Sequence, residues 1–398
     1  MGIVNRGRTG RFSSVRRHGI ALTAVACLVS LAACSTSAPG HAGPAAGVSP
    51  SVVAASNETP PASPSTSVPP TGAALTAALD AIVRTMSDFS GAVLVTRGNQ
   101  VLLAHASGEA DQQHRTPVTL TTRFRIASLT KQFTAMAILM LEHQGRLRLS
   151  DRICRYITNC PATWAPITLT ELLTHTSGIP DSWGDLSLAL LARSSPERNL
   201  VGFVGHVPLT FVPGSTFEYS NTGYLLLGVV IEKVSGMSYE AFLHKNIFGP
   251  LGMGNTGYDH GHQGVAVGYA TGSKVADPFP PNWAFSAGAL YSTVGDLHLW
   301  ERALAAGTVI PKPLAAELER PRVGTGFTYY GYGVFVDQTG TANPPQITKV
   351  YHLGETNGFL SSLSHDPENG LDVVILTNHE DTDLNGIDDQ LRQLVLGT

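Results

Sequence analysis

The apolar segment from Phe133 to Leu141 most constrains the fold of this 398-residue chain. It reads Phe-Thr-Ala-Met-Ala-Ile-Leu-Met-Leu and stops before Gly145. Wound as a helix, it is apolar around nearly its whole circumference, so it has no face to offer to water. We therefore predict a buried helix here, enclosed by other parts of the fold.

Strand patterns stand at both ends of the folded body, and short helical patterns with Pro and Gly punctuation fill the middle, from about 150 to 320. The other regular segments that we expect are a helix over 73–86, an apolar hairpin of 91–95 and 101–104, a core strand over 371–377 and a helix over about 385–396. A body of this size is large for one core. The pattern predicts an α+β protein, with one lobe built from both termini and a second, largely helical lobe.

The N-terminus has the pattern of a targeting signal over residues 1–33. A basic stretch ends at Arg17, and an apolar stretch too short to span a membrane runs from Ile20 to Ala33. The following Cys34 completes Leu-Ala-Ala-Cys, which resembles a bacterial lipobox whose cysteine is lipidated. The alternative is a plain cleaved signal with an incidental cysteine. The pair Arg16-Arg17 leaves Sec and twin-arginine export both open.

Residues 34–72 are expected to form a linker. Eight of the 38 residues from 35 to 72 are proline, and Glu58 is the only charged residue among them. Such a composition cannot bury enough apolar surface to fold. We expect an exported lipoprotein, anchored in the cell membrane by Cys34 and facing the cell envelope, whose folded body is 73–398.

The charge of the body excludes one class of partner. The chain has a formal net charge of −4, but residues 1–33 hold five arginines and no acid, which leaves 21 basic and 30 acidic residues in the remainder. An acidic body argues against a nucleic-acid partner.

Only two of the four cysteines, Cys154 and Cys160, belong to the body. In an exported protein a disulfide between them is expected. Two free thiols and a metal site are the alternatives, although two cysteines without nearby histidines make a poor zinc set.

A candidate nucleophile opens the buried helix, in Ser128-Leu129-Thr130-Lys131. The spacing of three places Ser128 and Lys131 one helical turn apart on one face. A serine hydroxyl is a weak nucleophile until a neighbouring base takes its proton, and a lysine in a dry pocket can have its pKa lowered enough to do so. Alone, the string also fits a helix cap followed by a surface lysine.

Two later segments supply further polar groups. Tyr219-Ser220-Asn221 precedes an apolar run, and Tyr219 could relay a proton while Asn221 donates to a carbonyl. The alternative is a buried tyrosine with a turn asparagine. His352-Leu353-Gly354 lies beside a strand pattern, where Gly354 would let a substrate lie against the strand edge and a following N–H could complete an oxyanion hole.

These three motifs, in this order, resemble those of the class C β-lactamases, DD-peptidases and related esterases. The resemblance covers nearly all of 73–398. It is reinforced by four other strings: Leu172-Leu173-Thr174-His175-Thr176-Ser177-Gly178, Tyr224-Leu225-Leu226-Leu227-Gly228, Pro250-Leu251-Gly252-Met253 and Gly288-Ala289-Leu290-Tyr291-Ser292-Thr293.

The resemblance implies an antiparallel sheet flanked by helices, a helical lobe and a site between them. It also implies an acyl-enzyme on Ser128, proton transfer by Lys131 and Tyr219, and no cofactor or metal. Substrate would be positioned by Asn221, His352 and Gly354. The backbone N–H groups of Ser128 and Glu355 would form the oxyanion hole.

One departure from the family pattern bears on substrate. The β-lactamases carry Lys-Thr-Gly at the third motif, whereas His352 and Leu353 remove the charge and the hydroxyl that hold an anionic substrate. We expect a monomer acting on a small ester, amide or peptide, with an uncharged acyl group fitting best. The alternatives are a D-Ala-D-Ala carboxypeptidase or weak β-lactamase on the same residues, and a penicillin- or peptidoglycan-binding protein without turnover.

Two other strings imitate functional motifs. Ala284-Phe285-Ser286-Ala287-Gly288 resembles a nucleophile elbow, but no supporting Asp/His order follows it, so we expect Ser286 to be structural. Residues 381–386 match the first half of a calcium loop, yet Arg392 stands where a bidentate glutamate is required, which favours a helix-capping turn.

Overall fold

The computed structural model describes residues 71–86, 89–181, 201–202, 204–261, 264–277, 284–325, 327–340 and 345–397. The signal segment 1–33, the lipidation candidate Cys34 and nearly all of the linker 34–72 lie outside the described residues. From Thr66 onward the chain forms one compact unit. None of the described helices combines the length and apolar character needed to cross a membrane.

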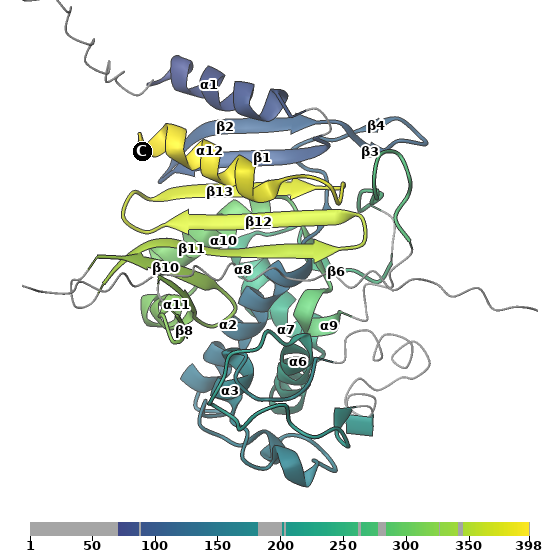
Figure 1. The fold of residues 1–398 in the computed structure, drawn as a ribbon, viewed down its shortest axis with the longest axis vertical. Coiled ribbons are helices and arrows are strands. Elements are labelled where there is room, and N and C mark those ends of the chain that lie inside the picture. Colours follow the sequence, from purple (N-terminus) through teal and green to yellow (C-terminus); the bar gives the residue numbers. More distant parts are fainter. Residues whose placement is uncertain are drawn as a thin grey trace, which may run out of the picture. The chain divides into compact units, whose positions relative to one another are not determined.

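An eight-stranded antiparallel sheet is built from both ends of this unit (Figure 1). Its strand order is β2-β1-β13-β12-β11-β10-β9-β8. The strands are β1 (Gly91–Arg97), β2 (Gln100–Ser107), β8 (Val323–Thr325), β9 (Thr328–Tyr330), β10 (Phe335–Thr339), β11 (Gln346–Thr356), β12 (Phe359–Asp366) and β13 (Leu371–Thr377). The expected hairpin and core strand are therefore present, and β1 pairs directly with β13, Gly91 opposite Thr377.

Helices cover both faces of the sheet, because alternate side chains of its central strands are apolar on both sides. On one face, Val93 and Val95 of β1 and Val373 and Ile375 of β13 pack against α1 (Ala73–Arg84) and α12 (Leu384–Leu396). On the other, Leu94, Val374 and Leu376 join the larger core, with α10 (Val294–Ala306) against β1 and β13. Asp383 caps α12 by accepting from the Gly386 amide, as the capping reading of 381–386 expects.

The helical lobe surrounds α2 (Thr130–His143), whose residues from Thr130 to Leu141 are all buried. Its other helices are α3 (Leu169–Leu173), α6 (Asn221–Ser235), α7 (Tyr239–Leu243), α8 (Gly249–Leu251), α9 (Phe285–Gly288) and α11 (Lys312–Glu319), with single 3-10 turns at Ala127–Leu129, Ile153–Arg155 and Ala162–Trp164 and a π turn at His244–Phe248. Two small sheets complete the described part of the fold: β3 (Glu109–Asp111) with β4 (Thr116–Pro117), and β5 (Phe124–Arg125) with β7 (Leu290–Ser292) and β6 (Gly257–Tyr258). Because α2 packs against α6, α9 and α11, its lack of a polar face is explained.

A disulfide joins Cys154 and Cys160, with a sulfur–sulfur distance of 2.08 Å. The two cysteines flank a short loop, and Ile153 before it and Trp164 after it are fully buried against the helical lobe. The disulfide joins residues that are six positions apart in the sequence, so it closes a short loop in the unfolded chain and restrains it.

Replacing both Cys154 and Cys160 by alanine should lower the free energy of unfolding by about 2 kcal/mol, because the unfolded chain regains the entropy of the open loop. Urea denaturation of the wild type and the double variant measures the difference. A reductant should bring the wild type to the stability of the variant and leave the variant unchanged. Equal stability of the oxidised wild type and the variant would contradict this expectation.

Candidate active site

Ser128 lies in the 3-10 turn Ala127–Leu129, two residues before α2 begins at Thr130. The sequence predicted the serine at the opening of the helix itself. Ile126 and Leu129 on either side are fully buried and anchor the turn, while Ser128 stays half-buried. Ser361 on β12 donates to the carbonyl of Ile126 over 2.9 Å, which ties the turn to the sheet.

The backbone before Ser128 is strained. Ala127 has a φ of 43°, a left-handed value that costs a residue with a Cβ free energy and persists only where the surroundings impose it. Such strain is concentrated at functional sites in proteins. Here it turns the serine side chain towards a small cavity of about 80 Å³, which is lined by Ser128, Asn221 and Glu355 among others.

Lys131 is completely buried and reaches Ser128 from one turn further along the chain. Its Nζ lies 3.1 Å from the Ser128 hydroxyl, 2.8 Å from Oδ1 of Asn221 and 2.9 Å from the carbonyl oxygen of Ala287. The last two partners can only accept. A neutral amine would donate its two hydrogens to them and keep its lone pair for the serine hydroxyl.

The electrostatics of the site favour that neutral amine. Burial lowers the pKa of Lys131 to about 7, and the negative charge of Asp181 opposes part of that shift. Near neutral pH a large fraction of the amine is therefore unprotonated and able to accept a proton.

Tyr219 faces the same pair. Its side chain shares a hydrogen bond with that of Ser128, and the Lys131 Nζ lies 4.9 Å from the centre of its ring. Burial raises the pKa of the phenol above its usual value, although the Ser128 contact opposes this. The phenol therefore stays protonated at neutral pH, which makes it an O–H donor.

Asn221 begins α6 and is held by a residue that sequence reasoning missed. Asp181 accepts from the backbone N–H of Asn221 over 3.1 Å and from its side-chain Nδ2 over 3.1 Å. It also accepts from the backbone and hydroxyl of Thr222, each over 3.2 Å. These contacts fix the Asn221 amide with Oδ1 towards Lys131.

The third motif lies on β11, beside the Ser128 turn. Gly354 pairs with Ser361 of β12, and Glu355 is exposed and lines the cavity. A Cβ on Gly354 would lie 2.3 Å from the carbonyl oxygen of Ile126 and 3.1 Å from the Ser128 nitrogen. Only glycine lets the strand approach the nucleophile this closely.

His352 is placed differently from Gly354 and Glu355. It is 2% exposed, its Nε2 lies 3.3 Å from the Tyr330 hydroxyl, and it is not among the residues that line the cavity. Burial, then the charge of Lys131, lowers its pKa to about 3, so the ring is neutral. Contact of His352 with substrate stays a prediction.

His175 supports the site from behind. It is 1% exposed among the rings of Tyr219 (4.4 Å between centroids), Tyr330 (4.6 Å) and Tyr224 (5.0 Å). Its Nδ1 also accepts from the Ser220 amide over 3.0 Å. This bond holds the backbone between Tyr219 and Asn221, a role that its sequence position does not reveal.

Ser286 is structural, as expected. It is fully buried and donates to the Tyr224 carbonyl over 2.8 Å.

Comparison with known proteins identifies the family of the chain. A family model described as Beta-lactamase matches residues 79–397. The chain belongs to the beta-lactamase family. It is a serine hydrolase with the mixed α+β fold of β-lactamases and transpeptidases.

Its relatives include penicillin-binding protein 4* of Bacillus subtilis, 28% identical over 322 residues, which are 74% of this chain and 69% of that one. The chain spans 59% to 69% of the length of the curated relatives it matches. Among solved structures, a penicillin-binding protein from Bacillus halodurans is 28% identical with a TM-score of 0.70, covering 79% of this chain and 98% of that chain. The D-amino acid amidase from Ochrobactrum anthropi SV3, in complex with L-phenylalanine amide, is 25% identical with a TM-score of 0.69, covering 81% and 99%.

Gly354→Ala should slow labelling of the chain by a fluorophosphonate about 100-fold, because the new Cβ forces β11 away from the Ser128 turn. Gly254→Ala is the matched control: its Cβ meets nothing within 4 Å and its φ is not in the left-handed region. The measurement is the labelling rate of each variant. A wild-type rate for Gly354→Ala would show that the close approach of the strand is unimportant.

Proposed function

We propose that this family member cleaves an ester or amide bond through an acyl-enzyme on Ser128. The observation that carries the proposal is the 3.1 Å contact between the Ser128 hydroxyl and a buried Lys131 amine whose other partners are acceptors. It supports Lys131 as the base, since its lone pair faces the serine.

The proton balance follows from these contacts. The Ser128 hydroxyl proton passes to Lys131 as its oxygen attacks the carbonyl carbon, which forms a tetrahedral oxyanion. Tyr219 then donates its O–H proton to the leaving group and regains a proton from Lys131, which leaves the amine neutral. As the oxyanion reforms the carbonyl, the bond to the protonated leaving group breaks and the acyl-enzyme remains. Water then attacks the acyl carbon and passes one proton to Lys131, and that proton is returned to the Ser128 oxygen as its bond to the acyl group breaks, which releases the acid and restores Ser128.

Two backbone donors are proposed for the oxyanion. The N–H of Ser128 stands at the strained turn, and the N–H of Glu355 follows Gly354 at the edge of the cavity. Donors held rigidly in this way stabilise charge that develops in the transition state. The side-chain amide of Asn221, held by Asp181, is proposed to orient the substrate.

The substrate is proposed to carry an uncharged, apolar acyl or aminoacyl group. His352 is neutral, so it offers no charge to an anionic substrate. Next to the aromatic cluster around His175 is a pocket of about 600 Å³ lined by Phe217, Tyr330 and Phe335, among others. Aromatic walls favour an apolar side chain.

Peptidase chemistry is the second candidate, and the relatives favour it. They include penicillin-binding proteins and an amidase named for D-amino acids, whose complexes contain phenylalanine or its amide. The same groups of this chain would then open a D-alanyl peptide or, weakly, a β-lactam.

For the location of the protein, we propose a monomer that is tethered to the cell membrane through lipidated Cys34. Mass spectrometry of the membrane-extracted chain would test the lipidation.

A pair of labels should separate these substrate classes. We expect a fluorophosphonate to label the wild type at Ser128, located by mass spectrometry, and Ser128→Ala to remove the label. Ser292→Ala, at a serine that is fully buried outside the cavity, is the control and should label normally. Rapid labelling by a fluorescent penicillin, with turnover of D-Ala-D-Ala peptides, would favour the peptidase. An adduct on another residue would overturn the proposal.

Hydrolysis of a p-nitrophenyl ester should rise with pH through a midpoint near 7, because Lys131 must be unprotonated to act as the base. The rate at pH 5 should be about 100-fold below the plateau at pH 9. Asp181→Asn should move the midpoint to lower pH, since the Asp181 charge raises the pKa of Lys131.

Lys131→Met should abolish the acid limb together with most of the rate, and Lys233→Met, at an exposed lysine of α6, should change neither. The profile of kcat/KM against pH measures all four proteins. A flat wild-type profile between pH 5 and pH 9 would exclude Lys131 as the base.

A further inference from the structure

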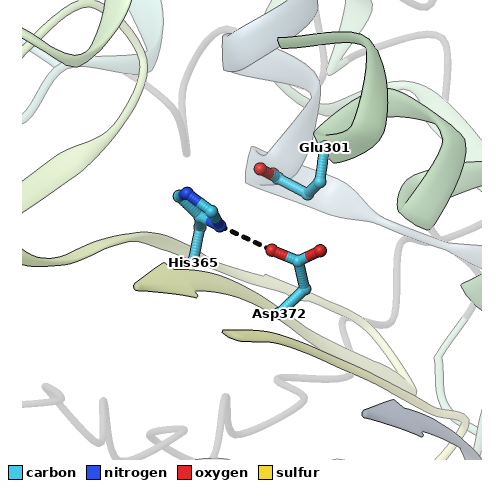
Figure 2. A group of neighbouring side chains, drawn as sticks. All are labelled: Glu301, His365 and Asp372. Atoms are coloured by element: carbon cyan, nitrogen blue, oxygen red, sulfur yellow. Dashed lines mark hydrogen bonds and ion pairs between the residues drawn. The ribbon is translucent and has the colours of Figure 1, made fainter. Parts of the chain in front are cut away.

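A second group of reactive side chains lies away from Ser128, between the sheet and α10. Figure 2 shows Glu301 of α10 pointing at His365 of β12 and Asp372 of β13. His365 and Asp372 are cross-strand partners, and their Nδ1 and Oδ1 atoms are 2.5 Å apart. One ligand atom from each of the three residues lies within 4.8 Å of the other two. Three donors from three elements therefore converge on one point.

Glu301 is the unusual member of the group. It is 7% exposed, yet no hydrogen bond to its carboxylate is found among the residues that the structure describes. A buried carboxylate without a donor costs several kcal/mol unless a cation or a proton compensates it. Because the Glu301 carboxylate points towards His365 and Asp372, a compensating cation or proton would lie between these three side chains.

The charged groups around Glu301 include carboxyl groups, but none of those that the structure describes carries a permanent positive charge. Glu319, at the end of α11, acts electrostatically on Glu301 and His365, and His298 lies 3.8 Å from the other oxygen of Asp372. The charged groups that act on Glu301 are His365, Asp372 and Glu319, so neither lysine nor arginine is among them within the described part of the chain. Although burial opposes it, the carboxylates of Asp372 and Glu301 raise the pKa of His365 to about 9, so a metal ion would bind by taking the place of the imidazolium proton.

We propose that Glu301, His365 and Asp372 form a binding site for a divalent transition-metal ion, and that Zn²⁺ fits it. Zinc accepts imidazole and carboxylate ligands together, with three protein ligands and a water in open tetrahedral sites. In a tetrahedron with bonds near 2.1 Å the ligand atoms stand about 3.4 Å apart. The 2.5 Å contact between His365 Nδ1 and Asp372 Oδ1 would therefore open by about 1 Å, and the widest separation, up to 4.8 Å, would close by about 1.4 Å.

A supporting shell is already in place around Asp372. Thr96 on β1 is the other cross-strand partner of Asp372. Its hydroxyl donates to Oδ2 of Asp372 over 3.2 Å. Outer contacts of this kind orient a carboxylate for a metal. Thr96, Asp372 and His365 thus form one row across three strands, with Glu301 above it.

The ion would act on stability, independently of the hydrolase reaction. His365 is four residues along β12 from Ser361, which contacts the Ser128 turn, and four strand residues span about 13 Å. A metal here would join α10 to the centre of the sheet and raise the melting temperature. It would leave fluorophosphonate labelling of Ser128 unchanged.

Calorimetric titration of the chelator-treated full-length chain with ZnCl₂ tests the site. We expect saturable binding that Glu301→Gln and His365→Gln each weaken at least tenfold. His114→Gln is the control, because His114 forms an exposed pair with Asp111 (2.6 Å) and should bind zinc as the wild type does. Absence of saturable binding, or equal affinity in Glu301→Gln and the wild type, would overturn the proposal.

A measurement on the wild type alone covers variants that fail to fold. Cobalt(II) in a tetrahedral site with an imidazole ligand absorbs visible light strongly, whereas the hydrated ion does not. We expect one equivalent of Co²⁺ to give this absorption, one equivalent of Zn²⁺ to remove it, and either ion to raise the melting temperature. A weak spectrum like that of hydrated cobalt, with an unchanged melting temperature, would mean that the cluster holds protons and no metal.

Discussion

The burial of one amine beside one hydroxyl is the constraint on which the rest of the site depends. Lys131 can be buried in a dry interior only if its nitrogen is fully hydrogen-bonded. Its three partners, Asn221, Ala287 and Ser128, come from three different parts of the chain. Each of those parts needs its own support. The Ser128 turn rests on β12, the start of α6 rests on Asp181, and α9 packs on α2 and α6. The two lobes therefore cannot be assigned separate tasks, because the sheet and the helices both hold atoms that the amine requires.

Features governed by short-range sequence were predictable. The core strand of residues 371–377 has the bounds expected from its apolar run, and α2 contains the whole segment from Phe133 to Leu141. The proximity of Ser128 and Lys131 followed from a spacing of three. The 3-10 turn at Ser128 could not be foreseen, because it depends on the strained backbone at Ala127, and no local pattern announces a left-handed alanine.

Features that join distant segments were out of reach. Asp181 serves Asn221 across 40 residues, and a lone aspartate after a proline carries no sign of that partner. His175 accepts a hydrogen bond from the Ser220 amide, and this contact depends on how the two segments cross. The convergence of Glu301 on His365 and Asp372 needs both the register of β12 against β13 and the rotation of α10. Sequence alone fixes neither the register nor the rotation.

The pairing of β1 with β13 also governs when the protein can form at all. β1 ends at Arg97, whereas β13, the strand that pairs with its second edge, begins only at Leu371. Until residue 377 has emerged from the ribosome, that edge of β1 has no partner of its own, and open edges invite pairing with other chains. Pairing of β1 with β13 must then close a very large loop, which makes folding slow. A nascent chain of this kind would depend on chaperones that keep it unfolded. A premature stop before Leu371 would leave a product in which the second edge of β1 stays unpaired and open to other chains.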